Sequence, residues 1–87
     1  MSITFPNPSR SYDAGARAVR FWGYDSAMEA SFFVSVAALE SMEPRMTADE
    51  MSILTAFDRH RDRICQAAAK VYSRGHKGSY DLNRSDF

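Results

Sequence analysis

Hydrophobic residues recur at two different spacings along the chain. Up to Val34 they alternate with polar ones, which is typical of β-strands, and after Thr47 they recur every three or four residues, as in a helix. At the start, the alternating residues 3–5 predict a short edge strand, because Pro6 and Pro8 end it. Residues 9–15 are small and polar and indicate a turn.

Two longer strands are predicted next, over residues 18–24 and 28–34, joined by a hairpin connection at residues 25–27. Side chains of a strand point alternately to opposite faces of the sheet. In the first strand Val19 and Phe21 therefore share one face, and Arg20, Trp22 and Tyr24 share the other. Both strands carry large apolar groups on each face.

Two helices are expected after these strands. Ser35 suits an N-cap for a short helix over residues 36–42. Thr47 and Glu50 fit a capping box that begins a long helix over residues 48–74, with Gly75 in the C′ position. About 27 helical residues would extend roughly 40 Å, whereas a domain of this size has a radius of gyration of about 12 Å. This helix is therefore either broken or overhangs the body.

The end of the chain predicts a fourth short strand over residues 79–82 and a turn over residues 83–87, with Phe87 as a terminal apolar anchor. The element order is then β-β-β-α-α-β. We expect a single α+β domain over residues 1–87, in which a small antiparallel sheet of three to four strands packs on one long and one short helix.

Composition narrows the class of protein. The 87 residues are 45% apolar and carry eleven Lys and Arg against eleven Asp and Glu. This balance argues against a polybasic DNA coat and against an acidic disordered tail. No apolar run reaches the ~20 residues of a membrane span, the N-terminus lacks the pattern of a secretory signal, and one cysteine cannot form an internal disulfide. We therefore expect a soluble cytoplasmic protein.

Several short stretches, in order along nearly the whole chain, carry a resemblance to a known family. They are Phe5-Pro6, Tyr12-Asp13, Val19-Arg20-Phe21, Val34-Ser35, Ala38-Leu39, Ala56-Phe57, His60-Arg61, Ile64, Leu82 and Asp86-Phe87. With these, the chain resembles the bacterial family known as domain of unknown function 1488. The resemblance implies a small α+β domain with an antiparallel sheet that carries helices. It implies no reaction and no catalytic or binding residue.

The aromatic residues are the most informative feature. If Val19, Phe21, Phe32 and Val34 meet the helices, then Trp22, Tyr24 and Phe33 lie on the opposite face. Three aromatics left in water would form a patch of the kind that marks an interface. The simplest cover is a second copy of the chain, since two-fold homodimers are the commonest assembly. The alternative is that the N-terminal strand, Tyr12 and Phe87 cover this face within one chain.

A basic stretch over residues 58–77 is the only charge asymmetry and suggests an anion or nucleic acid as partner. Its candidate contacts are Arg59, His60, Arg63, Lys70, Arg74 and Lys77. The structural alternative is a solvated helix face, with ion pairs along the helix and cations near its C-terminus. His60 and Arg61, beside the apolar stripe, suit either a polar pocket or boundary residues of the core.

Neither a metal centre nor catalysis is indicated. His60 and Cys65 do not converge on one helix face, and His76 lies beyond the helix end, whereas a closed zinc site needs four ligands. Cys65 sits among small apolar residues and is expected in the core. With no convergent nucleophile and base, we expect no cofactor and no enzyme. The sequence predicts a non-catalytic, homodimeric interaction module, with a nucleic-acid-associated regulator as the alternative.

Overall fold

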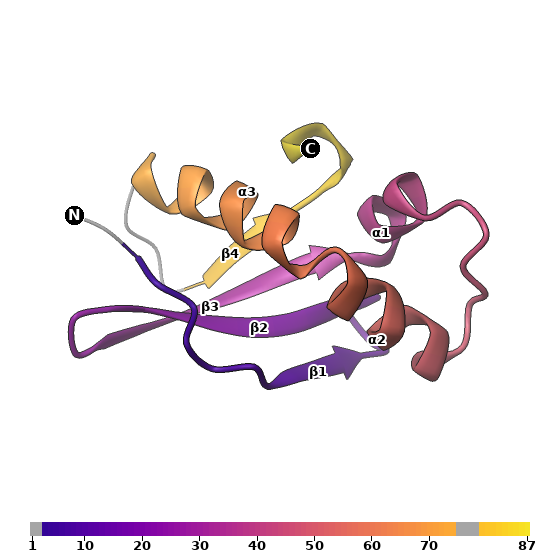
Figure 1. Cartoon of the computed structure of the whole chain (residues 1–87), viewed down its shortest axis with the longest axis horizontal. Helices are drawn as coiled ribbons and strands as arrows, with labels where there is room; N and C mark the ends of the chain where they lie inside the picture. The colour runs from indigo at the N-terminus through magenta and orange to yellow at the C-terminus, as the bar shows by residue number, and fades with distance from the viewer. Residues whose placement is uncertain (1–2, 75–78) are drawn as a thin grey trace.

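The computed structural model describes residues 3–74 and 79–87, and its centre is a four-stranded sheet in the order β1-β2-β3-β4 (Figure 1). The strands are β1 (Arg10–Asp13), β2 (Ala18–Asp25), β3 (Met28–Ser35) and β4 (Ser79–Leu82). The first three pair antiparallel, and β4 joins β3 in parallel. The predicted α+β class and the small sheet are confirmed, and the sheet is antiparallel as predicted except for β4.

In the described part of the chain, three helices lie between β3 and β4: α1 (Val36–Met42), α2 (Glu50–Arg59) and α3 (Arg61–Ser73). In Figure 1, α2 and α3 follow one another diagonally across the sheet. This long crossover returns the chain to the start of β3, so β4 runs in the same direction as its neighbour. Among the described residues, no helix has the length and apolar character that crossing a membrane would need.

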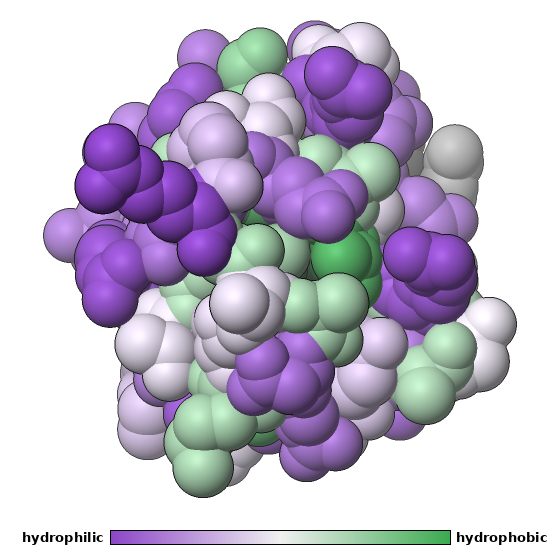
Figure 2. All heavy atoms as spheres, turned by 90° about the vertical axis from the view of Figure 1, so that its right-hand side faces the viewer, coloured by the Kyte–Doolittle hydropathy of each residue, from purple (hydrophilic) through white to green (hydrophobic). Residues whose placement is uncertain are grey.

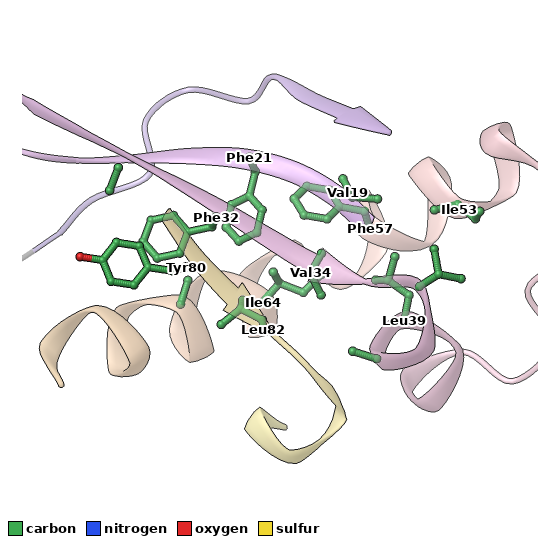
Figure 3. Close-up of a cluster of buried hydrophobic side chains, with 14 of the residues drawn as sticks. Val19, Phe21, Phe32, Val34, Leu39, Ile53, Phe57, Ile64, Tyr80 and Leu82 are labelled. Atoms are coloured by element: carbon green, nitrogen blue, oxygen red, sulfur yellow. The ribbon is translucent and has the colours of Figure 1, made fainter. Parts of the chain in front are cut away.

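One hydrophobic core fills the space between the sheet and the helices. Phe21 and Phe32 from the sheet meet Phe57 of α2 and Ile64 of α3, and all four are fully buried (Figure 3). Phe21 lies 5.4 Å from Phe32 and 5.2 Å from Phe57 between ring centroids, within the range of favourable aromatic pairs. The alternation of β2 and β3 thus places their strongest apolar positions against the helices, as predicted.

The predicted strand over residues 3–5 is wrong. In this segment only Thr4 forms a bridge, with Tyr24, before Pro6 and Pro8 remove the backbone donors that a ladder needs. The first strand is instead β1, inside the segment predicted as a turn. Its polar residues form a strand because they pair with β2 at a sheet edge, where only one face needs apolar side chains.

The predicted long helix is broken at His60, which separates α2 from α3. His60 has φ −108° and ψ 18°, and its amide still bonds the carbonyls of Ala56 and Phe57. The longest dimension of the molecule is 36 Å, shorter than the roughly 40 Å of an unbroken helix. The break lets α2 pack against β1 and β2 while α3 packs against β4.

Two helix caps test the predicted boundaries. Ser35 caps α1, since its hydroxyl accepts a 3.1 Å bond from the amide of Ala38. The capping box of Thr47 with Glu50 is wrong, because Asp49 caps α2 by accepting a bond from the amide of Ser52. The Thr47 hydroxyl donates to the Asp49 carboxylate instead. The predicted C′ position of Gly75 lies outside the described residues.

Candidate interaction surface

The sheet face opposite the helices, here called the outer face, carries the three aromatics predicted as interface residues. Along β2 it presents Arg20, Trp22 and Tyr24, and on the neighbouring strands it presents Ser31, Phe33 and Asp81. Trp22, Tyr24 and Phe33 are all half-buried, whereas Val19 and Phe21 on the other side are fully buried. The fold therefore gathers the predicted aromatics on one surface.

Arg20 organises the centre of the outer face. Its guanidinium lies 5.2 Å from the ring centre of Trp22 and 5.7 Å from that of Phe33, and it donates a 2.9 Å bond to the hydroxyl of Ser31. A guanidinium over an aromatic face is attracted by the negative charge density of the ring. Arg20 thus holds the two rings as one cation–π cluster.

A hollow of about 430 Å³ opens beside Phe33 at one end of the outer face. Its lining combines apolar side chains with two carboxylates, and comprises Asp13, Ala16, Ala18, Phe33, Ser35, Asp81, Leu82 and Asn83. Asp13 comes from β1 and Asp81 from β4, which are the two edge strands. The hollow therefore has a mainly apolar lining with an acidic group at each side of the sheet.

The segments that could have covered the outer face pack on the other side of the sheet. Ile3, Phe5, Tyr12 and Phe87 all contact the core cluster. The Phe5 ring lies 5.9 Å from Phe21 and 5.4 Å from Phe32, both of which face the helices. Phe87 is a terminal anchor, as predicted, and lies beneath the guanidinium of Arg63 on α3. These four side chains therefore do not cover Trp22 or Phe33.

Two predicted anion contacts, Arg59 and His60, share one carboxylate. Glu43 accepts a 2.5 Å bond from Arg59, and its other oxygen lies 3.1 Å from Nε2 of His60. The bond from Arg59, followed by that with His60, holds the pKa of the Glu43 carboxyl below its usual value. At the end of the molecule that faces the viewer in Figure 2, hydrophilic side chains surround a smaller group of hydrophobic ones. Arg59 and His60 thus serve to join α2 to the end of α1.

The remaining predicted anion contacts lie on α3 or beyond it. Arg63 and Lys70 line a shallow hollow of about 190 Å³ with Asp86 and Phe87, and Arg74 is exposed at the end of the helix. Lys77 lies outside the described residues. Because the helix breaks at His60, the five predicted contacts within the described residues do not form one continuous basic face.

The last two polar candidates are Arg61 and Cys65, and both contact other parts of the fold. Arg61 donates a 2.6 Å bond to the carbonyl of Asn7 and covers the Phe57 ring, so it ties the N-terminal arm to the helices. Its Nη1 atom is buried and has no hydrogen-bond partner among the described residues. Cys65 is half-buried against the core, and burial raises the pKa of its thiol. Within residues 3–74 and 79–87, no three metal-ligating side chains come together.

Asp81 is the residue of this surface that the sequence pattern missed. Alternation along β2 already places Arg20 beside Trp22, but Asp81 joins them only because β4 pairs with β3 in a register that puts it opposite Phe33. A four-residue strand carries no signal for its partner, its direction or its register. The hollow beside Phe33 follows from the same pairing.

Comparison with known proteins agrees with this fold. A solved structure, described as a protein of unknown function from the DUF1488 family of Shewanella loihica PV-4, superposes with a TM-score of 0.83. The two chains are 20% identical, over 95% of this chain and 93% of the other, so the likeness shows the fold alone. No curated protein matches the chain. The family profile described as "Protein of unknown function (DUF1488)" matches residues 3–82, and the chain belongs to this family.

Proposed function

We propose that this protein is a non-catalytic protein-interaction module that forms a homodimer through its outer face. The observation that carries the proposal is the placement of Ile3, Phe5, Tyr12 and Phe87 on the helix side of the sheet. Because these four side chains pack against the core, they do not cover the outer face, and Trp22, Tyr24 and Phe33 stay half-buried there. Aromatic residues and arginine are enriched in protein interfaces, and both occur together here.

The size of the face sets the expected strength of the dimer. Two strands of eight residues and two of four, at the usual strand spacing and rise, cover a projected area of roughly 400 Å² per protomer. The two protomers together would then bury roughly 800 Å², which is below the roughly 1,200–2,000 Å² of stable interfaces and in the range of weak, transient ones. We therefore expect a reversible dimer with a dissociation constant in the micromolar range.

The absence of catalysis is part of the proposal and is supported by the partners of the reactive groups. His60 lies against Glu43, which also binds Arg59, so the imidazole is engaged in a structural contact. Cys65 has a raised thiol pKa, which disfavours the thiolate that a nucleophile requires. An interaction role uses neither group.

Sedimentation velocity across a range of concentrations around 10 µM, together with Trp22 fluorescence, tests the proposal. We expect the average mass to rise from one to two chains, and the emission of Trp22 to shift to shorter wavelength as the dimer buries it. Trp22→Ser and Phe33→Ser should abolish this rise. Met51→Ser, which changes a methionine 76% exposed on α2, is the matched control and should leave association intact. A wild-type chain that stays monomeric would refute the homodimer.

A nucleic-acid-associated regulator is the alternative, favoured by one observation. Arg63, Lys70 and Arg74 follow one another at spacings of seven and four on or at the end of α3, so they share one stripe of the helix and all are exposed. This alternative predicts binding to DNA or RNA that weakens steeply with salt. The absence of any mobility shift at about 50 mM salt would reject it.

A further inference from the structure

Three residues of the outer face, one positive, one aromatic and one negative, lie in one row across the sheet. In the strand register, Arg20 on β2 lies opposite Phe33 on β3, and Phe33 lies opposite Asp81 on β4. Neighbouring strands are about 4.8 Å apart, so the positive and the negative residue flank Phe33 at equal distances. The row therefore has an aromatic centre with a charge of each sign on either side.

Neither charge is neutralised within the described part of the chain. Arg20 bonds the uncharged hydroxyl of Ser31 and contacts two rings. Asp81 is exposed, and its carboxylate has no hydrogen bond or ion pair to a described residue. The described ion pairs join Arg10 to Asp58, and Arg59 and His60 to Glu43. Within the described residues, nothing therefore prevents Arg20 and Asp81 from pairing with charged groups of another chain.

When this row is reversed and placed over the same row of a second copy, each charge faces the opposite charge and Phe33 faces Phe33. A two-fold axis that lies in the interface and runs along β3 leaves β3 over its own copy and exchanges the two sides of the sheet. It therefore brings β2 over β4 of the partner and β4 over β2 of the partner. Two sheets packed face to face keep their strands within about 30° of each other, so this arrangement is compatible with ordinary sheet packing.

We propose that two copies of the chain pair about this axis, so that Arg20 of each protomer meets Asp81 of the partner subunit and the two Phe33 rings meet at the centre. The inference rests on the proposed homodimer and specifies its symmetry and its contacts. The dimer then contains two equivalent interfacial ion pairs, which is the isologous pattern of a two-fold interface.

The shape of the outer face fits the same axis. The hollow of about 430 Å³ adjoins Phe33 and is lined by small side chains such as Ala18 and Ser35, so it offers each protomer a place for the Phe33 ring of the other. In the next row, Trp22, Ser31 and Ser79 are in register, and the axis places Trp22 over the small Ser79 of the partner subunit. Trp22 thus faces a small side chain, which leaves room for its ring between the two sheets.

Charge reversal tests the proposed contacts. In Arg20→Glu a carboxylate faces the partner's Asp81, and in Asp81→Lys an ammonium faces the partner's Arg20. We expect each variant alone to raise the dissociation constant at least tenfold, because like charges in an interface are repulsive. An equimolar mixture of the two variants should dimerise again, since the mixed dimer regains one correct pair at each end. The double variant should also associate.

Arg45→Glu and Glu40→Lys are the matched controls, because they make the same charge changes at exposed residues of α1 and the loop after it. Both should associate like the wild type, and circular dichroism should show that every variant is folded. A wild-type dimer that single reversal does not weaken, or that the mixture does not restore, would overturn the Arg20–Asp81 contact and leave the homodimer standing. A strictly monomeric wild type would overturn both.

Discussion

Tyr72 on α3 donates a 2.7 Å hydrogen bond from its phenol to the carboxylate of Asp25 at the end of β2. The bond joins the last turns of the helix layer to the β2–β3 hairpin, 47 residues earlier in the chain. The bond to Asp25, followed by burial, raises the pKa of Tyr72 to about 12. It is a polar contact between the sheet and α3, beside the apolar packing of the core.

This contact predicts a specific loss of stability in alkali. An unfolded tyrosine ionises near pH 10, so between about pH 10 and 12 the unfolded chain releases this proton before the folded chain does. The stabilisation is therefore complete below about pH 10 and declines as the pH rises through 12. Urea denaturation at several alkaline pH values should show this decline in the wild type and a smaller one in Tyr72→Phe. Parallel curves for the two proteins would contradict the assignment.

Phe57→Ala should destabilise the protein by about 3–5 kcal/mol, because it leaves a cavity among Phe21 and the other core side chains. Equilibrium denaturation with urea measures the change. Met51→Ala is the control on the same helix, since Met51 is 76% exposed, and it should change stability by less than about 0.5 kcal/mol. Equal effects of the two substitutions would mean that α2 does not pack on the sheet as described.

Gly23→Ala should loosen the N-terminal arm. A Cβ at Gly23 would lie 2.6 Å from a ring carbon of Phe5 and 2.9 Å from a methyl carbon of Ile3, so both side chains must move. We expect a destabilisation of about 1–3 kcal/mol and faster proteolysis near residues 3–8. Gly15→Ala, where the nearest atom is 3.4 Å away, should leave both measurements unchanged. An arm as resistant as in the wild type would rule out this packing.

Ser35→Ala should lower stability by about 0.5–2 kcal/mol, because the amide of Ala38 loses the hydroxyl that caps α1. Thermal unfolding followed by circular dichroism is suited to this small change. Ser41→Ala removes a hydroxyl from an exposed position of the same helix and serves as the comparison. If both variants unfold at the same temperature, the cap contributes nothing to the stability of the protein.

Residues 18–35 show how far a pattern can predict a fold. Their alternation correctly indicates two strands, the buried face with Val19 and Phe21, and the opposite face with Trp22 and Phe33, because a strand side chain has only two directions. Ser35 is likewise predictable as a cap, since capping is a local hydrogen bond. The errors occur where local preference is weak, at the polar strand β1 and at the choice between Thr47 and Asp49.

The sequence by itself determined which residues are buried in the central hairpin, that helices follow it, and that aromatics remain on the second face, since these depend on periodicity and short-range bonding. Only the tertiary structure decided that the long helix breaks at His60, that Ile3, Phe5, Tyr12 and Phe87 join the core, and that Asp81 stands beside Phe33. Those outcomes depend on contacts between segments far apart in the chain. Such contacts are set by how the elements fill the space over one sheet, and no short window of residues contains that information.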